Sequence, residues 1–230
     1  MKKIEITSFK DFLDLIDGFS SLSNNITLYR GQTFNHDLLP SIARKNNNVD
    51  TTNLERNMLK EFKRRTLNTG LLNILKTECD WLIYGQHYGL KTRLLDWSSN
   101  PLISLWFGLL TTSDNGYLYI LSENQEKILT TNEISPFDSK EIQLLKPSFN
   151  NKRIISQSGW FTVHPFNDSE KKVTPLNECK INSDKIVEVK IPNRYISDFI
   201  KKLDIMGINS EFIFQDITGT CSYINWQFNI

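Results

Sequence analysis

The chain has 230 residues and a net charge of +1, with 39% hydrophobic, 23% charged and 11% aromatic residues. This composition is typical of a globular protein and excludes disordered, collagen-like and coiled-coil chains. The near-neutral charge excludes a broad electrostatic attraction to nucleic acid or to an anionic membrane. No apolar run in the sequence approaches the roughly 20 residues that span a bilayer, and the N-terminal residues lack the apolar stretch of a signal peptide. Three scattered cysteines without a CxxC pair indicate reduced thiols, so we expect a cytoplasmic protein.

Helix and strand patterns alternate along the first half of the chain. Phe9, Phe12 and Ile16 repeat at helical spacing, and Ser8 can cap that helix. The predicted elements, in chain order, are a helix from Ser8 to Gly18, a strand at 26–29, a helix from about Asn53, a helix at 78–88, a strand at 92–97, a helix opened by Asn100-Pro101 and a strand at 117–121.

The second half is more polar and its elements are shorter. The pattern predicts a surface excursion at 123–151, strands at 154–163 and 186–191, a helix at 193–203, a strand at 211–214 and a short C-terminal helix. No internal repeat and no Gly/Ser/Pro-rich linker divides the chain. We therefore expect one domain over 1–230, of the α/β (mixed α+β) class, with a central mixed sheet flanked by helices.

The motifs of several common enzyme classes are missing from the sequence. It contains no GxGxxG, GxxxxGK[ST], HExxH or GxSxG. His36, His87 and His164 lie far apart, without the i,i+4 spacing of helical metal ligands. No metal is therefore expected.

The residues that could bind a ligand lie in three short blocks of the sequence. In the first, Tyr29-Arg30-Gly31-Gln32, a strand-end arginine can offer its planar fork to a phosphate or carboxylate, and the glycine lets a ligand approach the backbone. A surface arginine beside a turn glycine would give the same tetrapeptide. The third block, 153–165, holds a Trp160-Phe161 pair that could support a flat ligand or fill the core.

The second block, 85–101, mixes hydrogen-bonding and apolar residues too closely for a plain core strand. Period-two alternation over 92–97 places Asp96 on one face and Arg93 on the other. Two alternatives stay open at this point. Arg93 and Asp96 could form a buried structural ion pair, and His87 could be a satisfied core histidine.

Together these blocks resemble the FRG domain, a family named for a Phe-Arg-Gly motif that reads Tyr29-Arg30-Gly31 here. The segments that carry the resemblance are 29–32, 86–89, 92–97, 100–101, 153–165 and 207–219. The chain has Gln215 where the family usually has a proline, and Ser104 where it generally has alanine. The resemblance implies a bacterial or phage protein, with settings that suggest defence or toxin systems.

The order of the blocks in turn resembles the Arg–Ser–Glu class of ADP-ribosyltransferases, which implies an ADP-ribosyltransferase-like fold and NAD as the substrate. The implied catalytic residues are Arg30, Ser98, Gln157 and Glu211. The implied residues that bind the nucleotide are Tyr29, Arg30, Gly31, Gln32, Gln86, His87, Tyr88, Arg93 and Asp96. In this scheme Arg30 neutralises a phosphate, the Gly31 backbone holds the nicotinamide amide, and Ser98 orients the ribose or the acid.

The position of the catalytic acid departs from that pattern. Gln157 stands where the class has a Glu-x-Glu strand, and Glu188 and Glu211 are alternatives on later predicted strands. With Gln157 in the site, the protein would bind a nucleotide without turning it over, or would use Asp96 differently.

We therefore expect a nucleotide (NAD) binding domain with ADP-ribosyl transfer or NAD glycohydrolase activity. The alternative is a non-enzymatic module that recognises a protein or a nucleic acid, the latter through a helix stripe of Arg56, Lys60, Lys63 and Arg64. The same stripe is also typical of a solvated helix face. A third possibility is a hydrolase that acts on a phosphodiester through His87, Arg93 and Asp96. No membrane partner is expected, and the oligomeric state is left undetermined.

Overall fold

The structure, a computed structural model, describes residues 1–20, 24–110, 114–148, 151–179 and 185–229. These residues form a mixed eight-stranded sheet in the order β1-β8-β4-β2-β3-β7-β6-β5. The strands are β1 (Lys2–Glu5), β2 (Asn25–Gln32), β3 (Leu94–Ser98), β4 (Gly116–Asn124), β5 (Ile128–Thr130), β6 (Gln143–Lys146), β7 (Gly159–Val163) and β8 (Ile186–Ile191). An α/β fold built on a mixed sheet is therefore confirmed.

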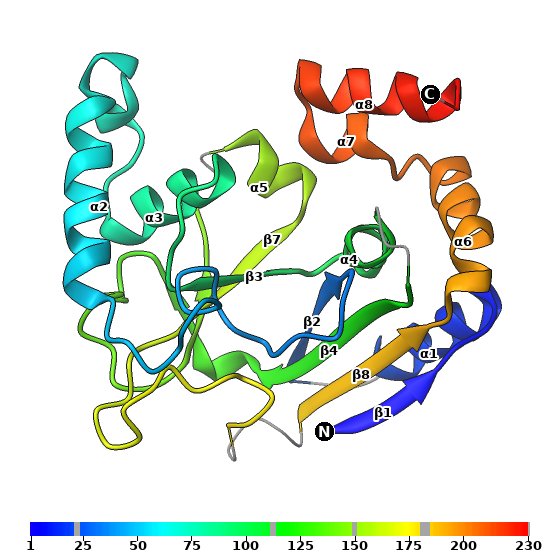
Figure 1. The fold of residues 1–230 in the computed structure, drawn as a ribbon, viewed down its shortest axis with the longest axis horizontal. Coiled ribbons are helices and arrows are strands. Elements are labelled where there is room, and N and C mark those ends of the chain that lie inside the picture. The colour runs from blue at the N-terminus through cyan, green and yellow to red at the C-terminus, as the bar shows by residue number, and fades with distance from the viewer. Residues whose placement is uncertain (21–23, 111–113, 149–150, 180–184, 230) are drawn as a thin grey trace.

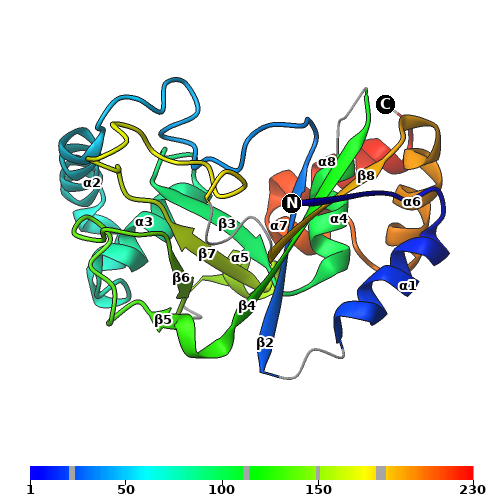
Figure 2. The ribbon, with the colours of Figure 1, turned by 90° about the horizontal axis from the view of Figure 1, so that it is seen from below.

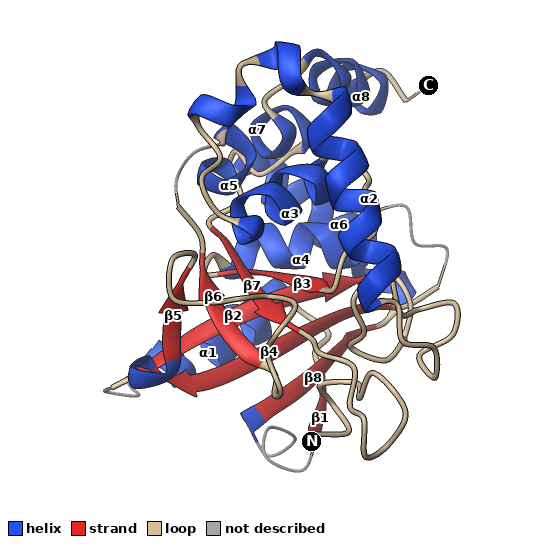
Figure 3. Cartoon of the chain, turned by 90° about the vertical axis from the view of Figure 1, so that its left-hand side faces the viewer, coloured by secondary structure: helices blue, strands red, loops and turns tan. Residues whose placement is uncertain are grey.

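Helices flank this sheet. They are α1 (Phe9–Ser20), α2 (Thr52–Arg65), α3 (Glu78–His87), α4 (Pro101–Leu109), α5 (Lys152–Ser156), α6 (Asn193–Ile205), α7 (Ser210–Phe214) and α8 (Ile217–Gln227), with short 3-10 helices η1 (Leu67–Thr69), η2 (Leu71–Asn73) and η3 (Gln125–Lys127). Figure 1 shows α2 and α8 on opposite sides of the molecule. In Figure 3 the helices α2 to α8 gather above the strands, whereas α1 lies at the level of the sheet. No described helix combines the length and the apolar character that a membrane crossing needs.

The sheet consists of two halves that meet at a single residue pair. β2 follows β4 through eight antiparallel pairs, but it pairs with β3 at Tyr29↔Ser98 alone. We call the strands β1, β8, β4 and β2 the β2 half, and β3, β7, β6 and β5 the β3 half. Figure 2 shows the two halves diverging to either side of this junction. Strands that diverge leave space between them, and this space determines where the site lies.

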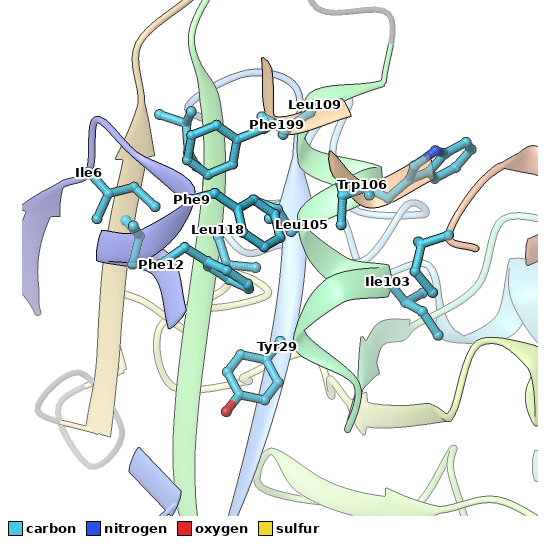
Figure 4. Packing of buried hydrophobic residues seen from close by; sticks show 14 of the residues in the cluster. Ile6, Phe9, Phe12, Tyr29, Ile103, Leu105, Trp106, Leu109, Leu118 and Phe199 are labelled. Carbon is cyan, nitrogen blue, oxygen red and sulfur yellow. The ribbon is translucent and has the colours of Figure 1, made fainter. Parts of the chain in front are cut away.

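Apolar side chains of α1, α4 and α6 pack on the β2 half. Figure 4 shows Phe9 and Phe12 of α1 together with Leu105 of α4 and Phe199 of α6, all of them buried. The approach of α4 is close because of a glycine: a Cβ on Gly31 would lie 1.9 Å from the Ser104 carbonyl oxygen and 2.2 Å from the Gly108 amide nitrogen. Any side chain at position 31 would therefore push α4 away from β2.

A second core lies on the β3 half, beneath α2 and α3. Leu59, Trp81 and Leu82 pack against Leu94 and Phe161. Helix α3 begins with a capping box, in which Thr77 and Asp80 each satisfy a backbone N–H of the other. The cap and the buried apolar residues fix the position of α3. As a result, its last residues, Gln86 and His87, lie beside the junction of the two halves of the sheet.

The predicted strand at 154–163 is wrong in its first part and confirmed at 159–163, and the predicted strand at 211–214 is wrong. Residues 154–163 form α5 and then β7, because Asn151 caps the helix through the amide of Arg153 and Ser158 turns the chain at a φ of 46°. Residues 211–214 lie in α7, where Asn209 caps the first turn through the amide of Phe212. The segments are short, so their apolar pattern fits a strand and a helix equally well, and the caps decide between them.

Two further differences concern the sheet edges. β1 has no counterpart among the predicted elements, and it pairs with β8 in parallel. Where the sequence predicts a surface excursion at 123–151, the chain adds β5 and β6 to the other edge of the sheet.

The predicted C-terminal helix is confirmed as α8.

We expect the protein to lose stability as the pH falls from about 6.5 toward 4, because two histidines are held neutral. Burial lowers the pKa of His164 to about 3 and that of His87 to about 4. Both pKa values lie below the unfolded value near 6.5, so the unfolded chain binds protons first and acid favours unfolding. The free energy of unfolding should change by up to about 1.4 kcal/mol per pH unit for each histidine. Denaturant titrations at pH 7, 6 and 5 measure this slope, and His164→Gln should reduce it. An unchanged slope in that variant would contradict the assignment.

Candidate functional site

A cleft with a volume of about 760 Å³ opens where the two halves of the sheet diverge. Its walls come from β2, β3, α3, α4, the loop at 33–44 and the turn between α5 and β7, with Phe214 of α7 at one side. We call it the central cleft. Its size is typical of small-molecule sites, which span roughly 300–1,000 Å³.

An ion pair across the sheet junction lines the central cleft. Nη1 of Arg30 on β2 lies 2.9 Å from Oδ2 of Asp96 on β3, and it also donates to the Asp96 carbonyl oxygen at 2.8 Å. The Arg30 side chain is 8% exposed and that of Asp96 is 60% exposed. Desolvation is the largest single effect on Asp96 and works against its ionisation. The charge and hydrogen bond of Arg30, a backbone hydrogen bond and the charge of Arg44 together outweigh it and lower the pKa of the carboxyl. The Nε atom of Arg30 is buried without a hydrogen-bond partner, so part of its donor fork is unused.

Residues at the C-terminus of α3 complete this side of the cleft. Gln86 donates from Nε2 to Oδ1 of Asp96 at 3.3 Å, while its Oε1 accepts a short hydrogen bond from the Thr92 hydroxyl. Burial is the main reason that the pKa of His87 is low, and its buried Nε2 has no partner. His87 is therefore a neutral imidazole at physiological pH, and its Nε2 is left without a hydrogen-bond partner beside the cleft.

Cationic and aromatic side chains surround the ion pair. Four cations, Arg30, Arg44, Lys91 and Arg153, line the cleft against one carboxylate, Asp96, so the described lining carries a formal excess of three positive charges. The aromatic lining residues are Tyr29, Phe34, Trp97, Phe107, Phe161 and Phe214. The cleft thus offers charge to an anion and flat apolar surfaces to a ring.

Arg153 is a cleft residue that is not among the predicted site residues. Its Nη1 donates to the His87 carbonyl oxygen at 2.7 Å, and its Nη2 forms a short ion pair with Asp216 at the start of α8. The guanidinium also lies over the rings of Tyr88 and Phe214. It therefore ties α3 to the C-terminal helices. Its position at the head of the third block, beside the aromatic residues, is the one signal that could have indicated it.

Most of the predicted site residues lie together. Those that line the central cleft are Tyr29, Arg30, Gly31, Gln32, Gln86, His87, Asp96, Ser98 and Gln157. Those that do not are Tyr88, Arg93 and Glu211. Tyr88 is 64% exposed, and Glu211 lies exposed on α7 with a hydrogen bond from Thr220.

The structure places Arg93 in the core of the β3 half. Its Nε lies 2.7 Å from Oε2 of Glu55, its other nitrogens bond Thr52 and the Pro136 carbonyl, and its guanidinium covers the Phe137 ring. The Arg93–Asp96 ion pair considered above is therefore wrong: each residue has a different partner.

Two predicted site residues also have packing roles. Gly31 gives α4 room against β2. The Ser98 hydroxyl donates to the Gln157 carbonyl oxygen at 2.6 Å and accepts from the Asn100 amide at 2.9 Å. This network connects β3, α4 and the start of β7, so Ser98 shapes the wall of the cleft.

Acidic neighbours partly neutralise the basic stripe on α2. Arg64 and Arg65 both pair with Glu61, and Arg56 pairs with Asp138. Lys63 lies over the Trp81 ring. These contacts are typical of a solvated helix face, so the stripe does not favour nucleic-acid binding over that simpler interpretation.

Comparison with known proteins agrees with the blocks found in the sequence. Residues 25–116 match the FRG domain, a range that holds the first two blocks, β2, α3, β3 and α4. No curated protein and no solved structure matches the chain. Among the described residues, no group of three or more His, Cys, Asp or Glu side chains is arranged to hold a metal. Residues 25–116, which supply Arg30, Gln86, His87 and Asp96 to the cleft, are therefore the part of this chain that is similar to the FRG domain family.

Proposed function

We propose that the central cleft binds a nucleotide, NAD, and that the protein transfers or hydrolyses its ADP-ribose in a bacterial or phage defence or toxin system. The observation that carries this proposal is the position of Arg30. Its guanidinium lines the cleft, 8% exposed, with Nε unpartnered and Asp96 held on Nη1.

The lining of the cleft supports a dinucleotide as the ligand. Arginine forks bind phosphate oxygens through paired donors, and Arg30, Arg44 and Lys91 give the cleft several cations. Phe34 is 50% exposed and offers a ring face to a base. A chain with a net charge of +1 can bind such a ligand because four of its cations line this one cleft beside a single carboxylate.

The reaction requires heterolysis of one bond. The C1′–N bond between ribose and nicotinamide breaks, its electron pair stays on the leaving nicotinamide, and a cationic ribosyl centre forms. An oxygen of water or of an acceptor then bonds C1′ and releases a proton. Residues of the cleft would hold the phosphates and stabilise the cationic centre.

Arg30→Ala should weaken NAD binding, because it removes a charged hydrogen-bond donor from the cleft. A lost charged hydrogen bond costs roughly 1.5–3 kcal/mol, or about 10- to 150-fold in Kd. Calorimetric titration with NAD measures binding, and chromatography of nicotinamide measures turnover. Arg64→Ala is the matched control, since Arg64 lies exposed on α2 in a surface ion pair.

Two results would contradict this proposal. If the wild-type protein shows no heat of binding, no thermal shift and no nicotinamide release with NAD, both the ligand and the activity are wrong. Equal losses in Arg30→Ala and Arg64→Ala would place the binding site outside the central cleft.

A further inference from the structure

We propose that Asp96 is the catalytic carboxylate of this cleft, the group that stabilises the cationic ribosyl centre in place of a glutamate on a later strand. This inference rests on the function proposed above and names the residue that would perform its central step.

The positions of the acids single out Asp96. Among the described residues that line the central cleft, it is the one carboxylate. Glu211 lies exposed on α7, outside the lining, and bonds Thr220. Glu188 is buried on β8, also outside the lining, and pairs with Lys3 at 3.2 Å. Gln157 lines the cleft but carries no charge.

The Asp96 carboxylate is also held in place. Its Oδ2 faces Nη1 of Arg30 at 2.9 Å, and its Oδ1 accepts from Nε2 of Gln86 at 3.3 Å. Gln86 is itself oriented by the hydroxyl of Thr92, which is fully buried. A charge that is fixed before the reaction stabilises a transition state without having to reorganise. Gln86 is then a positioning residue, which acts through Asp96.

The same carboxylate is accessible from the cleft. The Asp96 side chain is 60% exposed although its backbone lies inside the sheet between Leu95 and Trp97, which are buried. This exposure leaves the charge open to a ligand in the cleft.

In the step itself Asp96 remains an anion throughout. The C1′–N bond breaks with its electron pair going to nicotinamide, and the carboxylate faces the positive charge that develops at C1′. Water or an acceptor oxygen then forms the C1′–O bond, and its proton passes to solvent. Arg30 holds Asp96 on Nη1, and its positive charge lies in the same cleft, where it attracts a phosphate of the same substrate.

The test separates binding from turnover in Asp96→Asn. We expect nicotinamide release to fall by about 10²–10³-fold in kcat, the usual effect of removing one preorganised electrostatic group. Kd for NAD, measured by calorimetry, should change by less than tenfold. Glu61→Gln is the matched control, an exposed acid on α2 outside the cleft, and it should keep the wild-type kcat. Melting temperatures check that each variant is folded.

A second variant, Gln86→Leu, tests the proposal even if Asp96→Asn fails to fold. Gln86→Leu keeps the carboxylate and its charged or titratable neighbours Arg30, Arg44 and His87, but it removes one hydrogen bond to the anion. Because that bond favours the ionised form, its loss should raise the pKa of Asp96 and move the acid limb of the kcat profile to higher pH. A merely structural role for Gln86 would not move this limb.

The outcomes distinguish the two proposals. If wild-type protein and Asp96→Asn release nicotinamide equally fast, the assignment of Asp96 is overturned and the proposed activity stands. If the wild-type protein binds NAD without releasing nicotinamide, the catalytic assignment is overturned and the binding proposal stands. If the wild-type protein does not bind NAD, the proposed function fails and this inference fails with it.

Discussion

Replacing Gly31 with alanine should destabilise the protein severely, by about 3 kcal/mol or more, the upper end of the cost of overpacking. The new Cβ would lie 1.9 Å from the Ser104 carbonyl oxygen and 2.2 Å from the Gly108 amide nitrogen. Both are backbone atoms of α4, so no side-chain rotation can relieve the contact. We expect little folded protein, measured as soluble yield and as the midpoint of denaturant unfolding.

Gly18→Ala is the matched control for this variant. Gly18 lies near the end of α1, and a Cβ there would meet nothing within 4 Å. Alanine also has the higher helix propensity, so this change should be neutral or stabilising by up to about 1 kcal/mol. A Gly31→Ala protein as stable as the wild type would show that α4 does not pack on β2 as described.

Replacing Glu55 with alanine should cost about 3–5 kcal/mol, because it leaves a buried cation without its partner. Arg93 is 5% exposed and Glu55 is 1% exposed at the side chain, and Glu55 also accepts from the Arg93 amide at 2.7 Å. For a chain of this size that corresponds to a fall in melting temperature of about 10 °C. Thermal unfolding followed by circular dichroism measures it.

Two comparisons make this result specific to the buried pair. Glu61→Ala, in the same helix, removes an exposed acid and should leave the melting temperature almost unchanged. The double variant Glu55→Leu/Arg93→Met removes both charges and should recover part of the loss, since an apolar pair leaves no buried ion. A single variant as stable as the wild type would mean that Arg93 has another buried partner.

The secondary structure around the site could be predicted from local signals. The Thr77 and Asn100 caps, Pro101 and the alternation near Asp96 indicate α3, α4 and β3 through residues that are close together in the chain. The segments 154–163 and 211–214 could not be assigned in the same way. They are short apolar runs in which period and propensity favour no single state, and a cap at Asn151 or Asn209 decides the result.

The partners of the site residues were not predictable from spacing. Arg93 and Asp96 lie three positions apart, yet Arg93 pairs with Glu55, 38 residues earlier, and Asp96 pairs with Arg30, 66 residues earlier. Adjacent side chains on a strand point to opposite faces, and a sequence does not reveal which strand or helix will cover each face. Arg44 lines the cleft from outside the three blocks, whereas Lys91 and Arg153 line it from within the second and third blocks, although neither is among the predicted site residues.

The sequence alone determines that this chain is a mixed α/β protein of near-neutral charge, with its candidate ligand-binding residues in a few short blocks. The first two of these blocks lie in residues 25–116, which match the FRG domain. Composition and local pattern are sufficient for that, because they reflect which residues can be buried and which backbone states they favour. Only the tertiary structure decides that β2 and β3 separate after Tyr29↔Ser98 and that the space between them holds Arg30 and Asp96. The physical reason is that strand divergence and helix packing are set by contacts between residues distant in the chain.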